Sequence, residues 1–290
     1  MLSDSIPVPS LKSENEKNDL LVRRKLIDAA EGRLDTVTEE FENAFDILGK
    51  YEQTITVFGS ARLPMDHPVC LQAFAIAWAL SKHGYAIVTG GGGGVMQAAN
   101  KGAKDAGGPS IGFNIHLPME QKLNPYVTES FRFEHFFGRK VAMTLDASAY
   151  VFCGGGFGTF DEMFEIITLM QTGIIPRVPI ILLGVDYWTP LDDFINAKLV
   201  EEYQTIEPVD TELYTITDDI SMAVDLINTW SREQARQEMF ERAEKMKRRW
   251  EKQRETKEDS AVHVEKTSSR GVHAHHIHHR PHERTPVRHY

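Results

Sequence analysis

The sequence predicts a doubly wound α/β domain with a mainly parallel, Rossmann-like sheet and additional helices at both ends. Short apolar runs alternate with helical stretches from residue 54 onward, and glycine clusters at 90–94 and 154–158 directly follow two of these runs. The 290 residues are 41% hydrophobic, which is enough for a sizeable core. Continuous apolar strands that alternate with helices are typical of a parallel sheet covered on both faces.

The segment before the sheet is predicted in two parts. Residues 1–15 are polar and interrupted by prolines, so we expect them to be disordered. Residues 16–50 carry two helical patterns, and in the second the apolar residues recur at three- and four-residue steps. These residues are Leu34, Val37, Phe41, Phe45 and Leu48. Such a stripe predicts a helix that packs on an apolar surface.

Residues 52–230 form the predicted nucleotide-binding and catalytic domain. Its strands are expected in the runs "TITVFGS" (54–60), "YAIVTGGGGG" (85–94), "SIGFNI" (110–115), "SAYVFCGGG" (148–156) and "VPIILLG" (178–184). Helical stretches are expected at 69–84, 95–108, 159–173 and near 190–203, with a loop at 117–130. Residues 131–147 resume the alternation after that loop.

The end of the chain changes character twice. Residues 231–259 are rich in both signs of charge and lack Gly and Pro, which predicts a long solvated helix whose Phe240, Met246 and Trp250 touch a partner. Residues 260–290 hold eight of the twelve histidines and little that packs, so we expect a disordered His-rich tail.

Composition excludes several classes of protein. The sequence shows no apolar run long enough for a membrane span and no secretory signal, which predicts a cytoplasmic protein without a membrane partner. The two cysteines, Cys70 and Cys153, do not suffice for a disulfide framework or a cysteine zinc site. The net charge of −10 opposes binding to nucleic acid, which needs a basic surface.

The two glycine clusters predict an anion site. In doubly wound sheets, ligands bind at the carboxyl ends of the strands, where both clusters fall. A glycine-rich strand-to-helix turn lets backbone N–H groups converge on phosphate, and the helix dipole adds to the attraction. One glycine pair alone is more often a tight turn, but two clusters at neighbouring strand ends favour a ligand. No Gly-Lys-Ser/Thr follows either cluster, which excludes a P-loop. The strand at 110–115 lacks the ribose-binding acid of a dinucleotide site, which disfavours NAD.

Polar residues near the second cluster have two readings each. Thr159 stands where the next helix is expected to begin, so it either caps that helix or binds phosphate. Asp161 and Glu162 are expected in the first helical turn, where acids ordinarily complement the dipole. A phosphate would repel them, which suggests that at least one of them faces another part of the ligand. Arg139 and Lys140 are either surface charges or an anion-binding pair.

These motifs together resemble a known family. "GGGFGTFDE" (154–162) resembles a Pro-Gly-Gly-x-Gly-Thr-x-x-Glu signature, and it stands with "FFGRK", "TGGGGGVMQAANKGA", "VFGSAR" and the "QTG…PIILLG.DYW" segment. In order and spacing, residues 52–205 resemble the LOG family of cytokinin riboside 5′-monophosphate phosphoribohydrolases, formerly labelled lysine decarboxylases. The likeness is greatest to its longer, type II branch. Cys153 stands where that signature has proline. A decarboxylase would need pyridoxal phosphate on a lysine, and no lysine motif of that kind is present.

The resemblance implies hydrolysis of the N-glycosidic bond of an adenine-type nucleoside 5′-monophosphate, with no cofactor or metal. Glu162 would stabilise the ribosyl cation or orient water, and Arg139 would orient the ribose phosphate and Glu162. The remaining expected substrate contacts are Ser60, Gly91, Gly92, Gly93, Gly94, Lys140, Met143, Gly155, Gly156, Gly158 and Thr159. The family also implies a homodimer or larger homo-oligomer. Two alternatives stay open: a nucleotide or molybdenum-cofactor carrier without catalysis, and a broader nucleotide nucleosidase of salvage.

Overall fold

The computed structural model of the chain describes residues 21–25, 33–116, 122–145, 147–230, 237 and 239–250. The chain divides into two units, Met1–Ala235 and Arg236–Tyr290. The segments predicted to be disordered, 1–15 and 260–290, lie outside the described residues.

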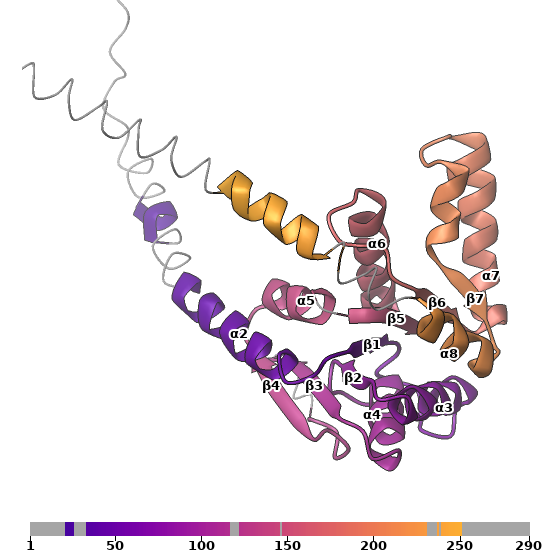
Figure 1. Cartoon of the computed structure of the whole chain (residues 1–290), viewed down its shortest axis with the longest axis horizontal. Helices are drawn as coiled ribbons and strands as arrows, with labels where there is room; N and C mark the ends of the chain where they lie inside the picture. Colours follow the sequence, from indigo (N-terminus) through magenta and orange to yellow (C-terminus); the bar gives the residue numbers. More distant parts are fainter. Residues whose placement is uncertain are drawn as a thin grey trace, which may run out of the picture. The chain divides into compact units, whose positions relative to one another are not determined.

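The first unit is built on a seven-stranded sheet in which every strand pair is parallel (Figure 1). The strands are β1 (Thr54–Phe58), β2 (Ala86–Thr89), β3 (Ser110–Ile115), β4 (Glu129–Phe133), β5 (Ala147–Cys153), β6 (Ile180–Leu183) and β7 (Thr215–Thr217). Their order is β4-β3-β2-β1-β5-β6-β7. The chain therefore fills one side of β1, then crosses to β5 on the other side. This confirms the predicted doubly wound α/β fold.

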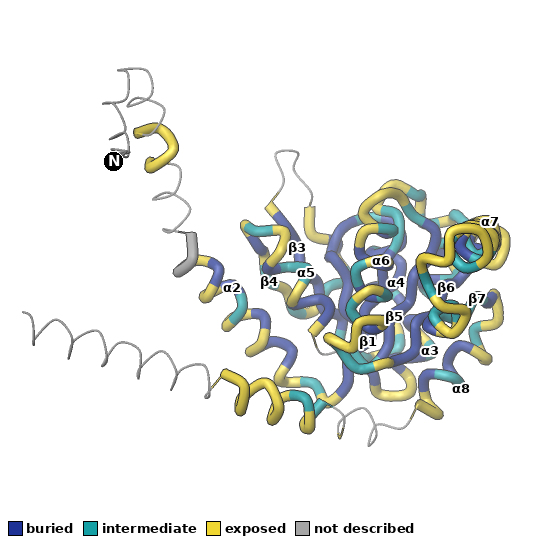
Figure 2. The backbone as a smooth tube through the Cα atoms, turned by 90° about the horizontal axis from the view of Figure 1, so that it is seen from above, coloured by how far each residue is buried: buried dark blue, intermediate teal, exposed yellow. Residues whose placement is uncertain are grey.

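Helices cover both faces of the sheet, as Figure 1 shows. Helices α3 (Pro68–Lys82), α4 (Val95–Asp105) and α8 (Ile220–Thr229) pack on one face. Helices α2 (Arg33–Leu48), α5 (Phe136–Thr144) and α6 (Phe157–Gln171) pack on the other. After β6, α7 (Val185–Phe194) continues into a π-helix (Ile195–Glu202), and a 3₁₀-helix (Pro208–Leu213) precedes β7. Figure 2 shows the buried strands between these helical layers.

Neither of the two edge strands lies in one of the five runs where strands were expected. β4 begins at Glu129, inside the stretch expected to be a loop, and its exposure alternates along the strand. β7 is only three residues long, and two of them are partly exposed. An edge strand is covered on fewer sides than a central one, so it lacks the continuous apolar run by which the central strands are recognised.

The buried face of helix α2 differs in part from the one predicted. Glu40, Ala44 and Ile47 are buried, whereas Phe45 is 39% exposed. The expected stripe is therefore wrong at Phe45, whereas Val37 and Leu48 are buried and Phe41 is partly buried. The helix contacts α5 and β4, and the small side chain of Ala44 lies fully buried in the core.

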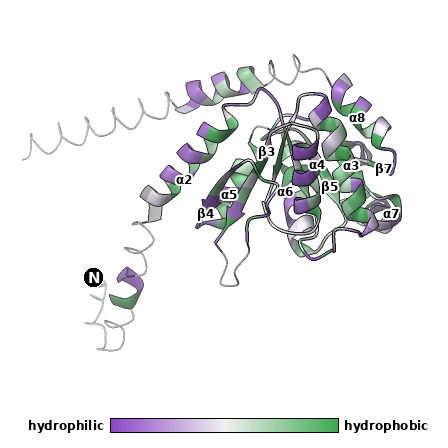
Figure 3. Ribbon diagram, turned by 90° about the horizontal axis from the view of Figure 1, so that it is seen from below, coloured by the Kyte–Doolittle hydropathy of each residue, from purple (hydrophilic) through white to green (hydrophobic). Residues whose placement is uncertain are grey.

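The second unit contains a helix over residues 239–250. Hydrophilic and hydrophobic residues mix along it (Figure 3), and Phe240, Met246 and Trp250 are exposed. Their contact with a partner stays a prediction. Across the described parts of both units, no helix has the length and apolar character needed to cross a membrane.

Candidate active site

A cavity of about 700 Å³ opens at the carboxyl ends of β1, β2, β3 and β5. Its lining comes from residues 57–62, Gly90, Met96, Ile115, Phe136, Arg139 and residues 156–162. β1 and β5 are neighbours in the sheet but are separated in the chain by three other strands, so the strand order reverses between them. The cavity thus lies at the switch point where ligands bind in doubly wound sheets.

The glycine loop after β5 presents bare backbone to this cavity. A Cβ added at Gly156 or Gly158 would meet no atom within 4 Å, so both positions are open. Gly155 differs, because a Cβ there would overlap the Thr159 hydroxyl and approach the Ser60 nitrogen. Helix α6 starts directly after Gly156, which provides no side-chain cap for its first N–H groups. An uncapped helix start with open glycines is suited to bind an anion.

Helix α6 begins two residues earlier than the sequence pattern predicted. Its first residue is Phe157, so Thr159 lies inside the first turn and is not the N-cap. Asp161 and Glu162 consequently fall in the second turn, and the expectation that they stand in the first turn is wrong. The helix dipole acts mainly on the terminal turn, which weakens the reading of this acid pair as ordinary helix-start charge.

Ser60, in the loop after β1, joins three parts of the site. Its N–H donates to Gly154 O at 3.1 Å, and its carbonyl accepts from Val95 N at 2.9 Å. Its Oγ accepts from Arg62 N at 3.1 Å. Arg62 itself lines the cavity and is exposed. Although "VFGSAR" drew attention to this loop, Arg62 was not among the predicted site residues.

The first glycine cluster contributes one residue to the cavity lining and forms the turn behind it. Gly90 lines the cavity, whereas Gly91, Gly92, Gly93 and Gly94 form the turn into α4 and are not part of the lining. Gly91, Gly92 and Gly94 are buried, and Gly93 is partly buried. Gly91 and Gly94 have φ of 68° and 60°, values that favour glycine. A Cβ at Gly94 would overlap the Ser60 carbonyl. This cluster therefore lets the β1 loop approach α4.

A buried network of polar side chains holds the glycine turn between β2 and α4. Thr89 Oγ1 donates to Asn100 Oδ1 at 2.6 Å and accepts from Gly91 N at 2.9 Å. Asn124 Nδ2 donates to Gly92 O and to Asn100 Oδ1, both at 2.9 Å. Because buried amides without partners are costly, this satisfied network gives the turn one conformation. The sequence signal was the asparagine in "QAANKGA", which only the fold places beneath the glycines.

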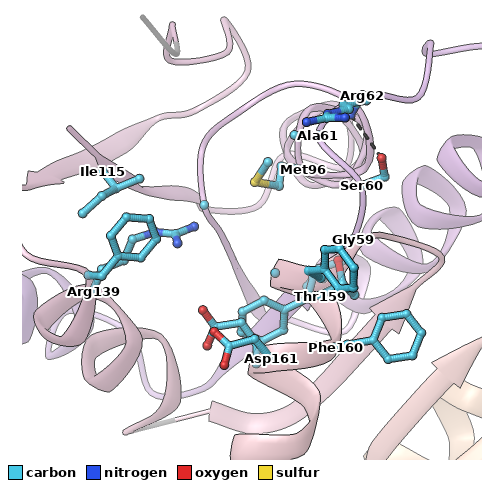
Figure 4. Close-up of a pocket in the computed structure, with 18 residues that line it drawn as sticks. Gly59, Ser60, Ala61, Arg62, Met96, Ile115, Arg139, Thr159, Phe160 and Asp161 are labelled. Atoms are coloured by element: carbon cyan, nitrogen blue, oxygen red, sulfur yellow. Dashed lines mark hydrogen bonds between the residues drawn. The ribbon is translucent and has the colours of Figure 1, made fainter. Parts of the chain in front are cut away.

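Arg139 projects from α5 into the middle of the cavity, opposite the loop that carries Arg62 (Figure 4). Its Nε donates to Phe113 O at 2.8 Å. A Cβ at Gly90 would overlap its guanidinium, so the glycine makes room for the side chain. Burial lowers the pKa of Arg139, and the Glu162 carboxylate opposes that change. An arginine remains charged under these conditions.

Glu162 contributes a buried carboxylate to the lining of the cavity. It is 7% exposed, and its Oε2 has no hydrogen-bond partner. Burial raises its pKa to about 7, despite the opposing charges of Lys140 and Arg139. The carboxylates of Glu165 and Asp161 add to the rise. A buried acid that titrates near neutral pH in a cavity is a candidate for proton transfer.

Lys140 lies beside the site rather than in its lining. Its Nζ pairs with Asp161 Oδ2 at 2.8 Å and Glu165 Oε2 at 2.6 Å. Burial alone would lower the pKa of Lys140, but these hydrogen bonds and the Glu162 charge outweigh it and raise the pKa. Lys140 thus ties α5 to α6. Met143 was expected to contact the nucleobase of the substrate. Its side chain is buried in the hydrophobic core and is not part of the cavity lining.

Aromatic side chains were missed by the sequence reasoning. Phe136, Phe157 and Phe160 line the cavity, and Phe157 is 96% exposed. Rings of this kind can stack on a planar base. Cys153, which replaces the signature proline, is fully buried at the end of β5, and burial raises the pKa of its thiol to about 12.

The geometry can be compared with known proteins. The profile of a family described as "Possible lysine decarboxylase" matches residues 96–227. A probable cytokinin riboside 5′-monophosphate phosphoribohydrolase of Arabidopsis thaliana is 37% identical over 119 residues, which are 40% of this chain and 58% of that protein. A cytokinin riboside 5′-monophosphate phosphoribohydrolase of rice, Oryza sativa subsp. japonica, is 33% identical over 128 residues. That match covers 43% of this chain and 52% of the rice protein.

Residues 96–227 are therefore similar to the family of the LOG phosphoribohydrolases. The matches span only about half of the length of these curated relatives. Among solved structures, the molybdenum cofactor carrier protein of Chlamydomonas reinhardtii is 24% identical with a TM-score of 0.46. The structural match covers 61% of this chain and 96% of the carrier protein. The segment that resembles the LOG signature, residues 154–162, supplies the glycine loop and Glu162 to the cavity.

Proposed function

We propose that the protein hydrolyses the N-glycosidic bond of nucleoside 5′-monophosphates of adenine type, and releases the base and ribose 5-phosphate. The observation that carries the proposal is Glu162: a buried carboxylate with a pKa of about 7, beside Arg139, in a cavity whose other wall is an open glycine loop. Its LOG relatives, several of them named as cytokinin riboside 5′-monophosphate phosphoribohydrolases, support the same chemistry.

The chemistry requires a carboxylate at the ribose. As the bond from C1′ to the base nitrogen breaks, its electron pair leaves with the base and positive charge develops on the ribose. The ionised Glu162 stabilises that charge and takes a proton from the water that attacks C1′. The base takes up a proton from solvent as it leaves, and Glu162 afterwards returns the proton from water to solvent. A carboxylate with a pKa near 7 is ionised in a large share of molecules at neutral pH and remains basic enough to accept this proton.

We place the phosphate at the start of helix α6, about one helical turn before Glu162. Gly156 and Gly158 offer open backbone at the helix start, and Thr159 lines the cavity beside them. Ser60 lies near Thr159, on the other side of Gly155. Arg62 adds a positive charge on the exposed side of the cavity. We infer that this part of the cavity binds the 5′-phosphate. The contacts expected from Gly91–Gly94, Lys140 and Met143 are indirect in this arrangement, because none of them belongs to the cavity lining.

The base is the least specified part of the substrate. Phe136 and Phe157 offer rings for stacking, which suits any planar base. The names of the relatives favour an N6-prenylated adenine, and AMP shares its ribose phosphate. A broader nucleotide nucleosidase would differ only at this end.

The family's older description as a lysine decarboxylase does not fit the residues. Such an enzyme needs a lysine that forms a Schiff base with pyridoxal phosphate. None of the residues described as lining the cavity is a lysine. The neighbouring Lys140 is held in ion pairs with Asp161 and Glu165.

The proposal predicts that Glu162→Gln loses turnover without losing affinity. The amide keeps the shape but removes the negative charge, so release of free base should fall by roughly 10²- to 10⁴-fold. Chromatography of products from AMP, isopentenyl-AMP and CMP measures turnover and base preference, and calorimetry measures nucleotide affinity. Asp161→Asn is the matched control. The Asp161 carboxylate is next to Glu162 in the chain, but it is exposed and paired with Lys140.

Full activity in the Glu162 variant, or a larger loss in the Asp161 variant, would refute the assigned role of Glu162. Tight nucleotide binding by the wild-type protein with no release of base from any of the three nucleotides would instead support a carrier.

A further inference from the structure

Glu40, on helix α2, is a buried carboxylate outside the cavity. It is 3% exposed, and charged side chains are rarely buried unless other groups satisfy them. Its Oε1 accepts hydrogen bonds from Glu134 N at 2.6 Å and His135 N at 3.3 Å. Both carboxylate oxygens also lie near His135 Nδ1, at 3.2 and 3.3 Å. All of these contacts converge on the segment that begins helix α5.

Glu40 holds the two residues that lead into α5, a helix without a side-chain cap of its own. The N-cap residue of this helix is His135, and its side chain caps no N–H of the helix. The first N–H groups of a helix carry partial positive charge and lack partners within the helix. A carboxylate delivered from another helix both complements that charge and fixes the chain entering α5.

The approach of the two helices is close enough to require a glycine. A Cβ added at Gly138 would lie 2.9 Å from Glu40 Oε2. Real Cβ atoms do not come so near, so either residue would have to shift. This explains the glycine in "FFGRK", immediately before Arg139. The position of the α5 backbone relative to α2 is therefore set at the residue next to the arginine.

Arg139 lies one helical turn after His135, the residue that Glu40 contacts. Its N–H donates to His135 O at 3.2 Å. The far end of its side chain is held by Phe113 O and by the space above Gly90. The guanidinium is thus fixed from the sheet at one end and from α2 at the other.

We propose that Glu40 is a positioning residue for Arg139: through the first turn of α5 it sets where the guanidinium stands relative to Glu162. Only the activity measurement that tests this role rests on the proposed function. Glu40 lies before β1 and outside residues 96–227, the part matched by the family profile. A segment that precedes the catalytic sheet therefore takes part in building the active site.

The test compares four variants of the full chain. Glu40→Ala removes the acceptor, whereas Glu40→Gln keeps an oxygen for the two backbone N–H groups. Glu39→Ala removes an exposed carboxylate from the same helix, and Ile47→Ala creates a cavity in the same buried face. Thermal denaturation identifies a temperature at which all four remain folded, and activity is measured there.

Glu40→Ala should lower kcat/KM for release of adenine by roughly 10- to 100-fold, as expected for a displaced catalytic group. Glu40→Gln should stay within about threefold of wild type, because the acceptor geometry persists. Glu39→Ala and Ile47→Ala should match wild type. A loss in Ile47→Ala equal to that in Glu40→Ala would make Glu40 merely structural, and an equal loss in Glu40→Gln would remove the acceptor role.

The pH dependence of activity provides a measurement that a loss of stability alone would not alter. Glu162 is surrounded by Arg139 and Lys140 from α5 and by Asp161 and Glu165 on its own helix, and the charge of Arg139 lowers its pKa. If Arg139 moves away, the midpoint at which activity rises with pH should shift upward in Glu40→Ala and stay in place in Ile47→Ala. An unchanged midpoint in Glu40→Ala would overturn the proposal.

Hydrogen exchange gives a reading independent of catalysis. The amides of residues 134–140 should exchange at least tenfold faster in Glu40→Ala than in Ile47→Ala or Glu40→Gln. Inactivity of the wild-type protein would therefore refute the proposed reaction alone. Unchanged exchange over 134–140 in Glu40→Ala would refute the positioning role alone.

Discussion

Glu162 combines a catalytic requirement with a cost in stability. Its pKa is about 7 in the folded protein, against an ordinary value of 4.5, and burial is the main cause. Between these two pH values the folded state holds a proton that the unfolded state releases. The stability gained from this proton is therefore complete below pH 4.5 and is lost as the pH rises through about 7.

Replacement of Glu162 by Gln should remove this pH dependence. The amide is neutral at every pH, so the variant should gain stability over wild type on the order of 1–3 kcal/mol at pH 8 and much less at pH 5. Thermal denaturation at the two pH values measures the difference. An equal shift at both would mean that the folded protein leaves the Glu162 pKa near its ordinary value.

At the residue scale, sequence reasoning could find what a local motif encodes. Glu162, Arg139 and Thr159 were predicted because the glycine pattern and "FFGRK" place them at fixed distances along the chain. Glu40 and Arg62 carry no such local signal. Glu40 lies 94 residues before the amide that it binds, and only the packing of α2 on α5 brings them together.

At the scale of elements, burial decides what is predictable. The five central strands are enclosed on both faces and read as apolar runs, whereas β4 and β7 at the edges do not. The start of α6 was misplaced because glycines usually argue against a helix. Here Gly158 is already helical, and its open position serves the cavity.

That placement predicts opposite effects of Gly158→Ala on stability and on binding. A Cβ at this position meets nothing within 4 Å, and alanine favours a helix over glycine by about 0.5–1 kcal/mol, so stability should hold or rise. The methyl group would enter the space proposed for phosphate, so KM for AMP should increase about tenfold or more. Adenosine, which lacks the phosphate, is the matched substrate: we expect it to turn over more slowly than AMP, and Gly158→Ala should leave that rate unchanged. An unchanged KM for AMP would move the phosphate away from this loop.

At the scale of the whole molecule, α5 and α6 present apolar side chains that the first unit leaves exposed. They are Phe136, Phe137, Val141, Leu145, Phe157 and Phe164. Lys140 joins the two helices through its ion pairs with Asp161 and Glu165, so these side chains belong to neighbouring elements. Exposed apolar patches of this kind commonly mark interfaces. Two of the residues, Phe136 and Phe157, also line the cavity.

We expect this surface to join two copies of the chain, as the sequence resemblance implied. Val141→Asp should then shift the protein toward monomer in light scattering at micromolar concentration, because a charge buried in an apolar interface has no partner. Val209→Asp is the matched control: its side chain is 43% exposed, against 40% for Val141, but it lies on the 3₁₀-helix after α7. Circular dichroism should show both variants folded. If the wild-type protein is already monomeric at this concentration, or if Val209→Asp dissociates it as readily as Val141→Asp, the α5–α6 surface is not the interface. If Val141→Asp yields a folded monomer that also loses turnover, the cavity rim formed by Phe136 and Phe157 depends on the second copy for its working shape.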